Sequence, residues 1–332
     1  MISAHAEMPT HPTTFLPLCA GYAPLMGHHR HLLDDRVRTQ AFRRAIARAV
    51  APGDVVADLG TGTGVLAIEA RRRGARTVYA IERDPIIHVA AAIARHNRVT
   101  GITWIEKHSR DVVLPEPVDV LVSECFGVLA FGGTMLEAVC DLRARHLRPG
   151  GRVVPAAVTV LIAPVQTPAD FAHVDVWSRA RYGLDFTPAA VLARNQPYNT
   201  LIAPRALLAR PALAAQVDLA RDTYAGTVDA TLAFAARAGT LHGFAAWFEA
   251  DLGGGVTLST APGRAATIWR QVYFPIAPIR LPRRRGGTPI ELAFHYAASH
   301  FTWSGRAGDT AFAQSTRHSF PGPLSPYAHP AR

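Results

Sequence analysis

Three glycines at alternate positions follow an acidic residue, a pattern typical of a loop that holds a nucleotide-like cofactor. The apolar run 55–57 ends at Asp58, and Gly60, Gly62 and Gly64 come next, before a helical spacing of apolar residues begins. This order predicts a strand, a tight turn and a helix whose N-terminus faces a ligand. Glycine tolerates positive φ angles and lets a ligand lie directly against the backbone.

A second acidic residue follows the next predicted strand. Glu82 ends the run 77–81 and lies 18 residues after Gly64, near the roughly 20 residues expected for an acid that binds ribose hydroxyls. Two features argue against a dinucleotide. The spacing G-x-G-x-G differs from the dinucleotide pattern G-x-G-x-x-G, and the carboxylate of Asp58 would repel a pyrophosphate but attract an ammonium group. We therefore predict a nucleoside cofactor that carries an amino group.

The run D-x-G-x-G-x-G at 58–64 resembles the first motif of the class I S-adenosylmethionine methyltransferases. The resemblance implies a Rossmann-like α/β domain with S-adenosyl-L-methionine as the cofactor. It implies that Asp58, the loop glycines and Glu82 contact this cofactor. It also places the segment 109–112 at the adenine edge, where Asp111 is the residue that would accept a hydrogen bond from the exocyclic amine.

A helical segment before the glycine loop narrows the resemblance to one family. Residues 29–39 match the pattern H-x-x-[ML]-L-x-D-x-x-R-T, which resembles the cofactor-covering segment of the protein arginine methyltransferases. Asp35 or its neighbour Asp34 fills the acidic position. The resemblance implies that His29 contacts the cofactor and that Arg38 holds the methionine carboxylate. The planar fork of a guanidinium suits this bidentate role.

The fourth predicted strand leads into a loop that supplies the candidate catalytic residue. Residues 123–127 read S-E-C-F-G and resemble the S-E-x-x-G loop of the arginine methyltransferases. The resemblance makes Glu124 the catalytic carboxylate and a further cofactor contact. Two positions depart from the family. Its second glutamate, nine residues after the first, falls at Gly133, and Ile268 replaces the histidine of its T-H-W loop.

These departures bear on the choice of methyl acceptor. In the family, two glutamates offset the charges of the acceptor guanidinium and of the cofactor sulfonium, whereas Glu124 alone leaves one positive charge unbalanced. Two unit charges about 4 Å apart repel by about 4 kcal/mol at an effective dielectric of about 20. The sequence thus favours methyl transfer to a nitrogen or oxygen nucleophile of a small-molecule or peptide-like acceptor. Protein arginine is the alternative acceptor, and in that case Glu137 or a substrate carboxylate would neutralise the remaining positive charge. A non-catalytic S-adenosylmethionine-binding protein is a third interpretation.

The predicted fold class is α/β, with two domains in succession. The chain has 332 residues, of which 49% are hydrophobic, enough for one large or two modest cores. Alternating apolar patterns without a strand–helix–strand rhythm predict that the second domain is an antiparallel β-barrel-like unit. The resemblance also implies a dimerisation arm and hence a homodimer. The expected boundaries are a flexible segment at 1–20, cofactor-covering helices at 21–50, the Rossmann-like domain at 51–155, the β-barrel-like domain at 156–305 with the arm at about 182–210, and a tail at 306–332.

Composition favours a cytoplasmic enzyme. No apolar run approaches the roughly 20 residues of a membrane span, and the first residues lack a secretory signal. Three cysteines without metal-ligand spacing predict a reducing cytoplasm, no metal site and no membrane partner.

The net charge of +10 invites a nucleic-acid partner. However, the basic residues are nearly all arginine and are spread along the chain, apart from one short run at 283–285. The loop 123–126 also occupies the place of the Asn/Asp-Pro-Pro-aromatic signature of base methylation. A nucleic acid is therefore not the predicted acceptor.

Overall fold

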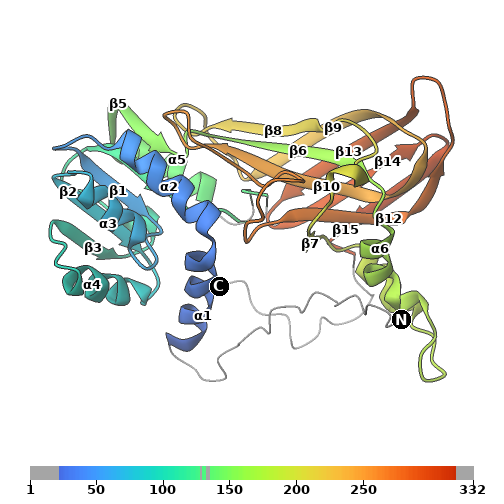
Figure 1. The fold of residues 1–332 in the computed structure, drawn as a ribbon, viewed down its shortest axis with the longest axis horizontal. Coiled ribbons are helices and arrows are strands. Elements are labelled where there is room, and N and C mark those ends of the chain that lie inside the picture. The colour runs from blue at the N-terminus through green and yellow to red at the C-terminus, as the bar shows by residue number, and fades with distance from the viewer. Residues whose placement is uncertain (1–21, 128, 132–134, 319–332) are drawn as a thin grey trace, which may run out of the picture.

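A five-stranded parallel sheet forms the first domain (Figure 1). The computed structural model describes residues 22–127, 129–131 and 135–318, so the predicted flexible segment 1–20 lies outside it. The sheet order is β3-β2-β1-β4-β5, and every neighbouring pair is parallel. The strands are β1 (Val55–Leu59), β2 (Thr77–Glu82), β3 (Ile102–Glu106), β4 (Val118–Ser123) and β5 (Leu147–Val154).

The central strands are apolar because helices cover the sheet. β1 and β4 are buried along their whole length, as expected for parallel strands joined by helical crossovers. The helix predicted before the first strand is two helices, which meet at Asp35. The helices of this domain are α1 (Tyr22–Asp34), α2 (Arg36–Ala49), α3 (Val65–Arg72), α4 (Ile86–His96), the short η1 (Ser109–Asp111) and α5 (Met135–His146).

The strand order reverses at β1, since β2 and β3 lie on one side of it and β4 and β5 on the other. In sheets of this kind, ligands bind in the crevice at the carboxyl ends of the strands beside the reversal. The glycine loop follows β1, and Glu124 follows β4. The topology therefore brings the two strongest sequence features to one place.

The second domain consists of two antiparallel sheets, which corresponds to the predicted β-barrel-like unit. One sheet has the order β7-β12-β10-β6-β8, with β11 paired to β10, and the other has the order β15-β14-β13-β9. The strands are β6 (Ala157–Val165), β7 (Tyr198–Thr200), β8 (Ala212–Asp218), β9 (Thr227–Ala236), β10 (Gly239–Asp251), β11 (Thr257–Ser259), β12 (Gln271–Leu281), β13 (Thr288–Ala297), β14 (His300–Ala307) and β15 (Thr310–Ser315).

Aromatic side chains hold the two sheets together. Phe274 of β12 packs on Phe294 and Trp303 of the other sheet, with ring centroids 5.3 and 5.2 Å apart. The Trp303 indole donates to the Pro275 carbonyl at 2.9 Å. Phe312 of β15 packs on Phe244, so residues 306–318 belong to this domain and not to the expected tail. The strand β15 is short, and its alternation is too brief to be read from sequence alone.

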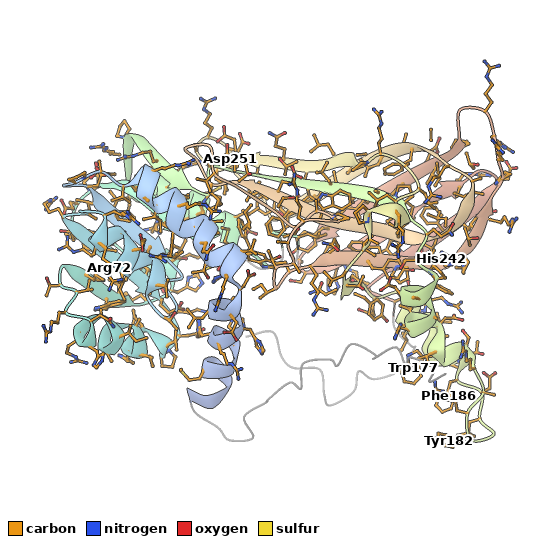
Figure 2. All side chains as sticks on the ribbon, viewed as in Figure 1. Arg72, Trp177, Tyr182, Phe186, His242 and Asp251 are labelled. Atoms are coloured by element: carbon orange, nitrogen blue, oxygen red, sulfur yellow. The ribbon has the colours of Figure 1, made fainter. Side chains whose placement is uncertain are left out.

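A helical segment projects from the second domain (Figure 1). It contains α6 (Pro168–Val174), η2 (Asp175–Ser178) and α7 (Thr187–Arg194), so it begins before the arm expected at about 182–210. The remaining short helix, η3 (Pro204–Ala206), follows β7. Trp177, Tyr182 and Phe186 lie on the projecting segment (Figure 2). Among the described residues, no helix is long and apolar enough to cross a membrane.

Candidate functional site

The candidate site lies where β1 and β4 end side by side. Leu59 pairs with Ser123 in the sheet register, and the Ser123 hydroxyl donates to the Leu59 carbonyl at 3.1 Å. The chain after Ser123 then crosses the glycine loop, so closely that a Cβ at Gly60 would overlap the Cys125 sulfur. Gly60 also has a φ of +72°, so both its conformation and its neighbour exclude a side chain.

The N-terminal helices close over the same loop. His29 of α1 lies against Gly62, whose φ is +51°, and a Cβ at Gly62 would be 2.9 Å from the imidazole ring. Burial lowers the pKa of His29, and the neighbouring His28 lowers it further. The N-cap of α3 is Gly64. The structure therefore gathers four residues that are predicted to contact the cofactor around one turn: Gly60, Gly62, Gly64 and His29.

Asp58 lies beneath this turn and is almost fully buried, with 1% of its surface exposed. Its Oδ2 accepts a hydrogen bond from the Thr61 hydroxyl at 2.6 Å, whereas its Oδ1 is buried without a partner among the described residues. Burial raises the pKa of Asp58 to about 6, against the opposing effect of the Thr61 hydrogen bond. A buried acceptor that lacks a donor needs an explanation, and a ligand amino group would supply the donor.

Glu82 is oriented by backbone amides. Its Oε2 accepts from the Gly62 amide at 3.1 Å, and its Oε1 accepts from the amides of Arg83 and Asp84 at 2.9 and 3.1 Å. These contacts fix the carboxylate beside the glycine loop and leave its Oε2 able to accept a second hydrogen bond. A ribose hydroxyl could supply that hydrogen bond.

Asp111 is less well defined as a site residue. It ends the short helix η1 and is exposed. No described contact joins its side chain to the glycine loop or to Glu82, so its role at the adenine edge stays a prediction.

Arg38 and Glu124 form a buried ion pair. The guanidinium Nη2 lies 2.6 Å from the Glu124 Oε2, and only 12% and 5% of the two side chains are exposed. The Arg38 Nη1 donates to the Leu32 carbonyl at 3.3 Å and to the Thr39 hydroxyl at 3.4 Å. Burial raises the pKa of Glu124 to about 7, although the Arg38 charge acts in the opposite direction. The catalytic candidate is thus a carboxylate that titrates near neutral pH.

The break between α1 and α2 positions Arg38. Asp35 caps α2, and its Oδ1 accepts from the Arg38 amide at 2.9 Å. Its Oδ2 accepts from the Ile268 amide, also at 2.9 Å. Asp35, and not Asp34, is therefore the structurally engaged acid of this segment. The capping of α2 by Asp35 could have been predicted, because aspartate is a common N-cap residue. The contact of Asp35 with the Ile268 amide has no such local signal and was missed.

An aromatic cluster from the second domain holds the loop that carries Glu124. The Trp269 indole donates to the Phe126 carbonyl at 3.1 Å, and the Phe126 ring packs on Phe248 and Trp269 with centroids 5.1 and 5.7 Å apart. The segment 267–269 thus contacts the site through two donors, the Ile268 amide, which binds Asp35, and the Trp269 indole, which binds the Phe126 carbonyl. The isoleucine in place of histidine leaves both of these contacts intact.

The position of a second carboxylate is only partly described. Gly133, where the family's second glutamate would fall, lies outside the described residues. Glu137, in the first turn of α5, lies against Gly226 of the connection between β8 and β9. Its Oε2 and the nearby Tyr224 hydroxyl are buried without partners among the described residues. No described contact joins Glu137 to Glu124.

Comparisons with known proteins give this geometry a context. Residues 33–156 match a family described as "Ribosomal protein L11 methyltransferase (PrmA)", and residues 156–285 match "Arginine methyltransferase oligomerization subdomain". The chain is 31% identical over 258 residues to protein arginine N-methyltransferase 6 of Xenopus tropicalis, and the match covers 73% of this chain and 76% of that protein.

The chain belongs to the protein arginine methyltransferase family. Solved structures of the family share the fold. The Trypanosoma brucei PRMT1 enzyme–prozyme complex with AdoHcy matches with a TM-score of 0.77 at 23% identity, and the match covers 87% of this chain and 97% of the other. Arabidopsis thaliana protein arginine methyltransferase 10 matches with a TM-score of 0.74 at 24% identity, and the match covers 87% of this chain and 96% of the other. The predicted family and fold class are confirmed.

The residues around the glycine loop fit S-adenosylmethionine, the cofactor of this methyltransferase family. Two buried polar atoms, the Asp58 Oδ1 and the Arg38 Nε, have no partner among the described residues. Their charges match the ammonium and the carboxylate of a methionine moiety, and Glu82 presents a carboxylate suited to ribose hydroxyls. The protein is therefore an S-adenosylmethionine-dependent methyltransferase, as the sequence predicted. The contacts assigned to single residues stay predictions.

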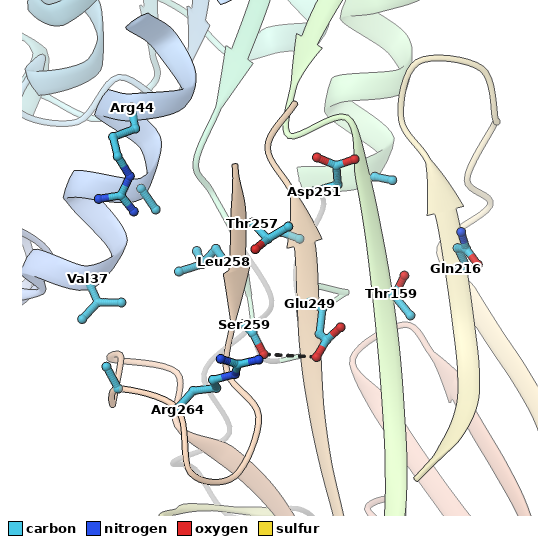
Figure 3. A pocket seen from close by; sticks show the side chains of 14 residues that line it. Val37, Arg44, Thr159, Gln216, Glu249, Asp251, Thr257, Leu258, Ser259 and Arg264 are labelled. Atoms are coloured by element: carbon cyan, nitrogen blue, oxygen red, sulfur yellow. Dashed lines mark hydrogen bonds between the residues drawn. The ribbon is translucent and has the colours of Figure 1, made fainter. Parts of the chain in front are cut away.

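A groove separates the covering helix α2 from the second domain (Figure 3). It encloses about 560 Å³ and is lined by α2 on one side and by β6, β8, β10 and β11 on the other. The acids Glu249 and Asp251 and the cations Arg44 and Arg264 line it together, and Glu249 accepts from the Ser259 hydroxyl at 3.2 Å. Val37, the residue before Arg38 in the chain, also lines the groove.

Proposed function

We propose that this protein is a protein arginine N-methyltransferase. The observation that carries the proposal is the buried carboxylate of Glu124 at the carboxyl end of β4, 2.6 Å from Arg38. The likeness to protein arginine N-methyltransferase 6 supports arginine over the small-molecule or peptide-like acceptor that the sequence favoured.

The charges around Glu124 support an arginine acceptor as well. Besides Glu124, the carboxyls of Asp35 and Asp58 are buried and close enough to raise the pKa of Glu124. When all three carboxyls are ionised, they and the guanidinium of Arg38 leave two negative charges. A sulfonium cofactor and a substrate guanidinium carry two positive charges, since the ammonium and carboxylate of the methionine moiety cancel. The objection based on Gly133 is therefore weaker than the sequence suggested.

The chain's own residues have three tasks in the reaction. When bound, the cofactor supplies an electrophilic methyl group. Glu124 accepts hydrogen bonds from the acceptor guanidinium, turns one nitrogen toward the methyl group, and takes the proton that this nitrogen loses on methylation. A pKa of about 7 suits that proton transfer near neutral pH. Arg38 holds the Glu124 carboxylate in position, and the aromatic cluster of Phe126, Phe248 and Trp269 keeps water from this side of the loop.

The groove beside α2 supports a polypeptide substrate. Its acids and cations would meet charged side chains on either side of the methylated arginine, whereas a small metabolite would leave most of the groove unused.

We also propose that the chain forms a homodimer. The match of residues 156–285 to an oligomerization subdomain of the arginine methyltransferases supports this. We place the dimer contact on the projecting segment, where the apolar side chains Trp177, Tyr182 and Leu184 are exposed.

The test is methyl transfer from labelled S-adenosylmethionine to an arginine-rich protein extract and, separately, to a small-metabolite extract. We expect label in protein, as methylarginine after hydrolysis. Glu124→Gln should lower transfer by at least about a hundredfold and leave cofactor binding near that of the wild type, whereas Glu291→Gln, an exposed carboxylate of β13, should change neither. Label only in the metabolite fraction would overturn the arginine proposal. Transfer by Glu124→Gln at a rate close to that of the wild type would overturn the role of Glu124.

A further inference from the structure

An arginine-lined hollow lies at one end of the second domain. It encloses about 610 Å³ between the turn that joins β9 to β10 and the connection from β12 to β13. Arginine and glycine dominate its lining, and none of the described residues that line it is acidic. The lining residues are Leu208, Ala235, Arg237, Ala238, Arg283, Arg284, Gly286 and Gly287.

The hollow is remote from the methyl-transfer site. β10 starts at the hollow, where Gly239 pairs with Leu281, and ends at Asp251, beside the groove next to α2. The strand has 13 residues, so its two ends are roughly 40 Å apart at about 3.3 Å per residue. Asp251 lies near the first domain and His242 toward the opposite end (Figure 2). A ligand in the hollow would not touch the cofactor loop.

The fold gathers arginines that are scattered in the sequence. Arg237 is tied to the segment before β8, since its Nη2 donates to the Arg205 carbonyl at 2.8 Å and its Nε to the Leu207 carbonyl at 3.3 Å. Arg237 therefore lines the hollow together with Arg283 and Arg284, although more than 40 residues separate it from them in the chain. The sequence showed only the short run and not this cluster.

The charges of this cluster are not neutralised. Among the described residues, none of the guanidiniums of Arg237, Arg283 and Arg284 forms an ion pair, although eleven other arginines and two histidines do so with a carboxylate. Arg283 and Arg284 are exposed, and Arg237 is held by carbonyls that leave its charge intact. Like charges fixed close together repel unless an anion lies between them.

The local backbone leaves room for such an anion. Gly286 and Gly287 have φ angles of +81° and +87°, and a Cβ at Gly286 would touch nothing within 4 Å. The Gly287 amide donates to the Arg284 carbonyl at 3.1 Å, which closes the turn and fixes the arginine-bearing loop. Guanidinium groups bind phosphate oxygens with two parallel hydrogen bonds.

We propose that this hollow binds the phosphate backbone of a nucleic acid, as a docking site separate from the methyl-transfer site. A nucleic acid offers phosphates at regular intervals and can meet several guanidiniums at once, whereas acidic side chains of a protein are irregularly spaced. In the part of the chain that the structure describes, no aromatic side chain lines the hollow, so binding depends on phosphates and not on base stacking or sequence. The net charge of +10 adds long-range attraction.

The test uses the full chain and fluorescence anisotropy with a labelled duplex DNA and a labelled single-stranded RNA of mixed sequence, over a range of salt concentrations. We expect the logarithm of the binding constant to fall linearly with the logarithm of salt concentration, with a slope of about −2 to −4 for a few phosphate contacts. Arg283→Ala/Arg284→Ala should weaken binding about tenfold at low salt and make the slope shallower by about 2.

The control removes the same charge elsewhere. Arg72 and Arg95 are exposed on α3 and α4 and form no ion pair with the residues described, so Arg72→Ala/Arg95→Ala should leave both affinity and slope close to those of the wild type. An equal loss in the control would overturn the site in favour of overall charge. Tighter binding of polyglutamate or of anionic lipid vesicles, with the same dependence on Arg283 and Arg284, would replace nucleic acid as the ligand. Methyl transfer to an arginine peptide without nucleic acid should be unchanged in both variants.

Discussion

The guanidinium of Arg38 and the carboxylate of Glu124 lie 2.6 Å apart and are both buried. Isolated charges are costly to bury, so each of these groups stabilises the other in the site. The resemblance assigned Arg38 to the methionine carboxylate. The structure pairs it with the catalytic candidate and leaves its Nε without a described partner, so one guanidinium can serve both groups.

Replacing Arg38 should therefore damage the enzyme in a pH-dependent way. Arg38→Ala leaves Glu124 buried without a counter-charge, which raises the pKa of that carboxyl further. We expect a loss of stability of about 3–5 kcal/mol where Glu124 must ionise, larger at pH 8.5 than at pH 6. Thermal unfolding at the two pH values measures it. Arg36→Ala, an exposed position on the same helix, is the control, and an equal loss at both pH values would contradict the pairing.

The activity should rise with pH through about 7, where Glu124 loses its proton. Glu124→Gln should lower kcat/KM by about 10²–10⁴-fold and remove this dependence. Stability should change in the opposite direction. Because the folded-state pKa of Glu124 is raised from 4.5 to about 7, the folded state binds more protons than the unfolded state in that window, and stability falls as pH rises through it. The variant should flatten this part of the stability curve. A wild-type activity that is flat between pH 6 and 8 would contradict the role of Glu124 as base.

The core of the site could be predicted because its signals are local. Asp58, the glycine loop and Glu82 lie at strand ends that a simple apolar pattern reveals, and strand order then places them beside Glu124. A parallel sheet with this order has one crevice at its carboxyl edge. The nature of the cofactor follows from residue types at fixed spacing.

The remaining relationships could not be predicted, because they join residues far apart in the chain. Asp35 meets Ile268 across 233 positions, and no pattern near either residue indicates the other. The acids that act on Glu124 are also distant in the chain, since Asp35 caps α2 and Asp58 lies in β1. Arg237 likewise lies in one hollow with Arg283 and Arg284 only after the sheets assemble.

Gly60→Ala should be more harmful than a glycine substitution with the same backbone conformation elsewhere. A Cβ at Gly60 would overlap the Cys125 sulfur, whereas one at Gly53, with φ of +91°, would touch nothing within 4 Å. Both variants carry a strain of about 1–2 kcal/mol from the left-handed conformation, but only Gly60→Ala also displaces the loop that carries Glu124. We expect at least a tenfold loss of cofactor affinity for Gly60→Ala in calorimetric titration and almost none for Gly53→Ala. Adding Cys125→Ala should recover part of it, and no recovery would rule out the overlap as the cause.

Asp35 should contribute to stability through both of its carboxylate oxygens. Asp35→Ala removes the cap of α2, worth about 0.5–2 kcal/mol, and leaves the Ile268 amide without an acceptor, which costs about 1–3 kcal/mol more. Asp35→Asn keeps one acceptor oxygen and should lie between the wild type and the alanine variant. Denaturant unfolding measures the three proteins. Asp34→Ala, at an exposed surface pair with Arg30, should change stability by less than about 1 kcal/mol; an effect as large as that of Asp35→Ala would show that the wrong acid had been identified.

The projecting segment should hold two copies of the chain together. Tyr182 is 95% exposed and Leu184 61% exposed, and apolar side chains gathered on one projection usually mark an interface. Tyr182→Arg/Leu184→Arg places two charges in that contact and should shift the protein from dimer to monomer in sedimentation velocity at micromolar concentration. Leu213→Arg, at a half-exposed leucine of β8, is the control for a charge placed at an exposed leucine outside the projecting segment. It should leave the dimer intact. Because the segment lies away from the glycine loop (Figure 1), the monomeric variant should stay folded, with an unfolding temperature lowered only by the loss of association. A fall in the activity of this folded monomer would mean that the second copy supports the first copy's site. A wild type that is monomeric throughout would remove the homodimer from the proposal.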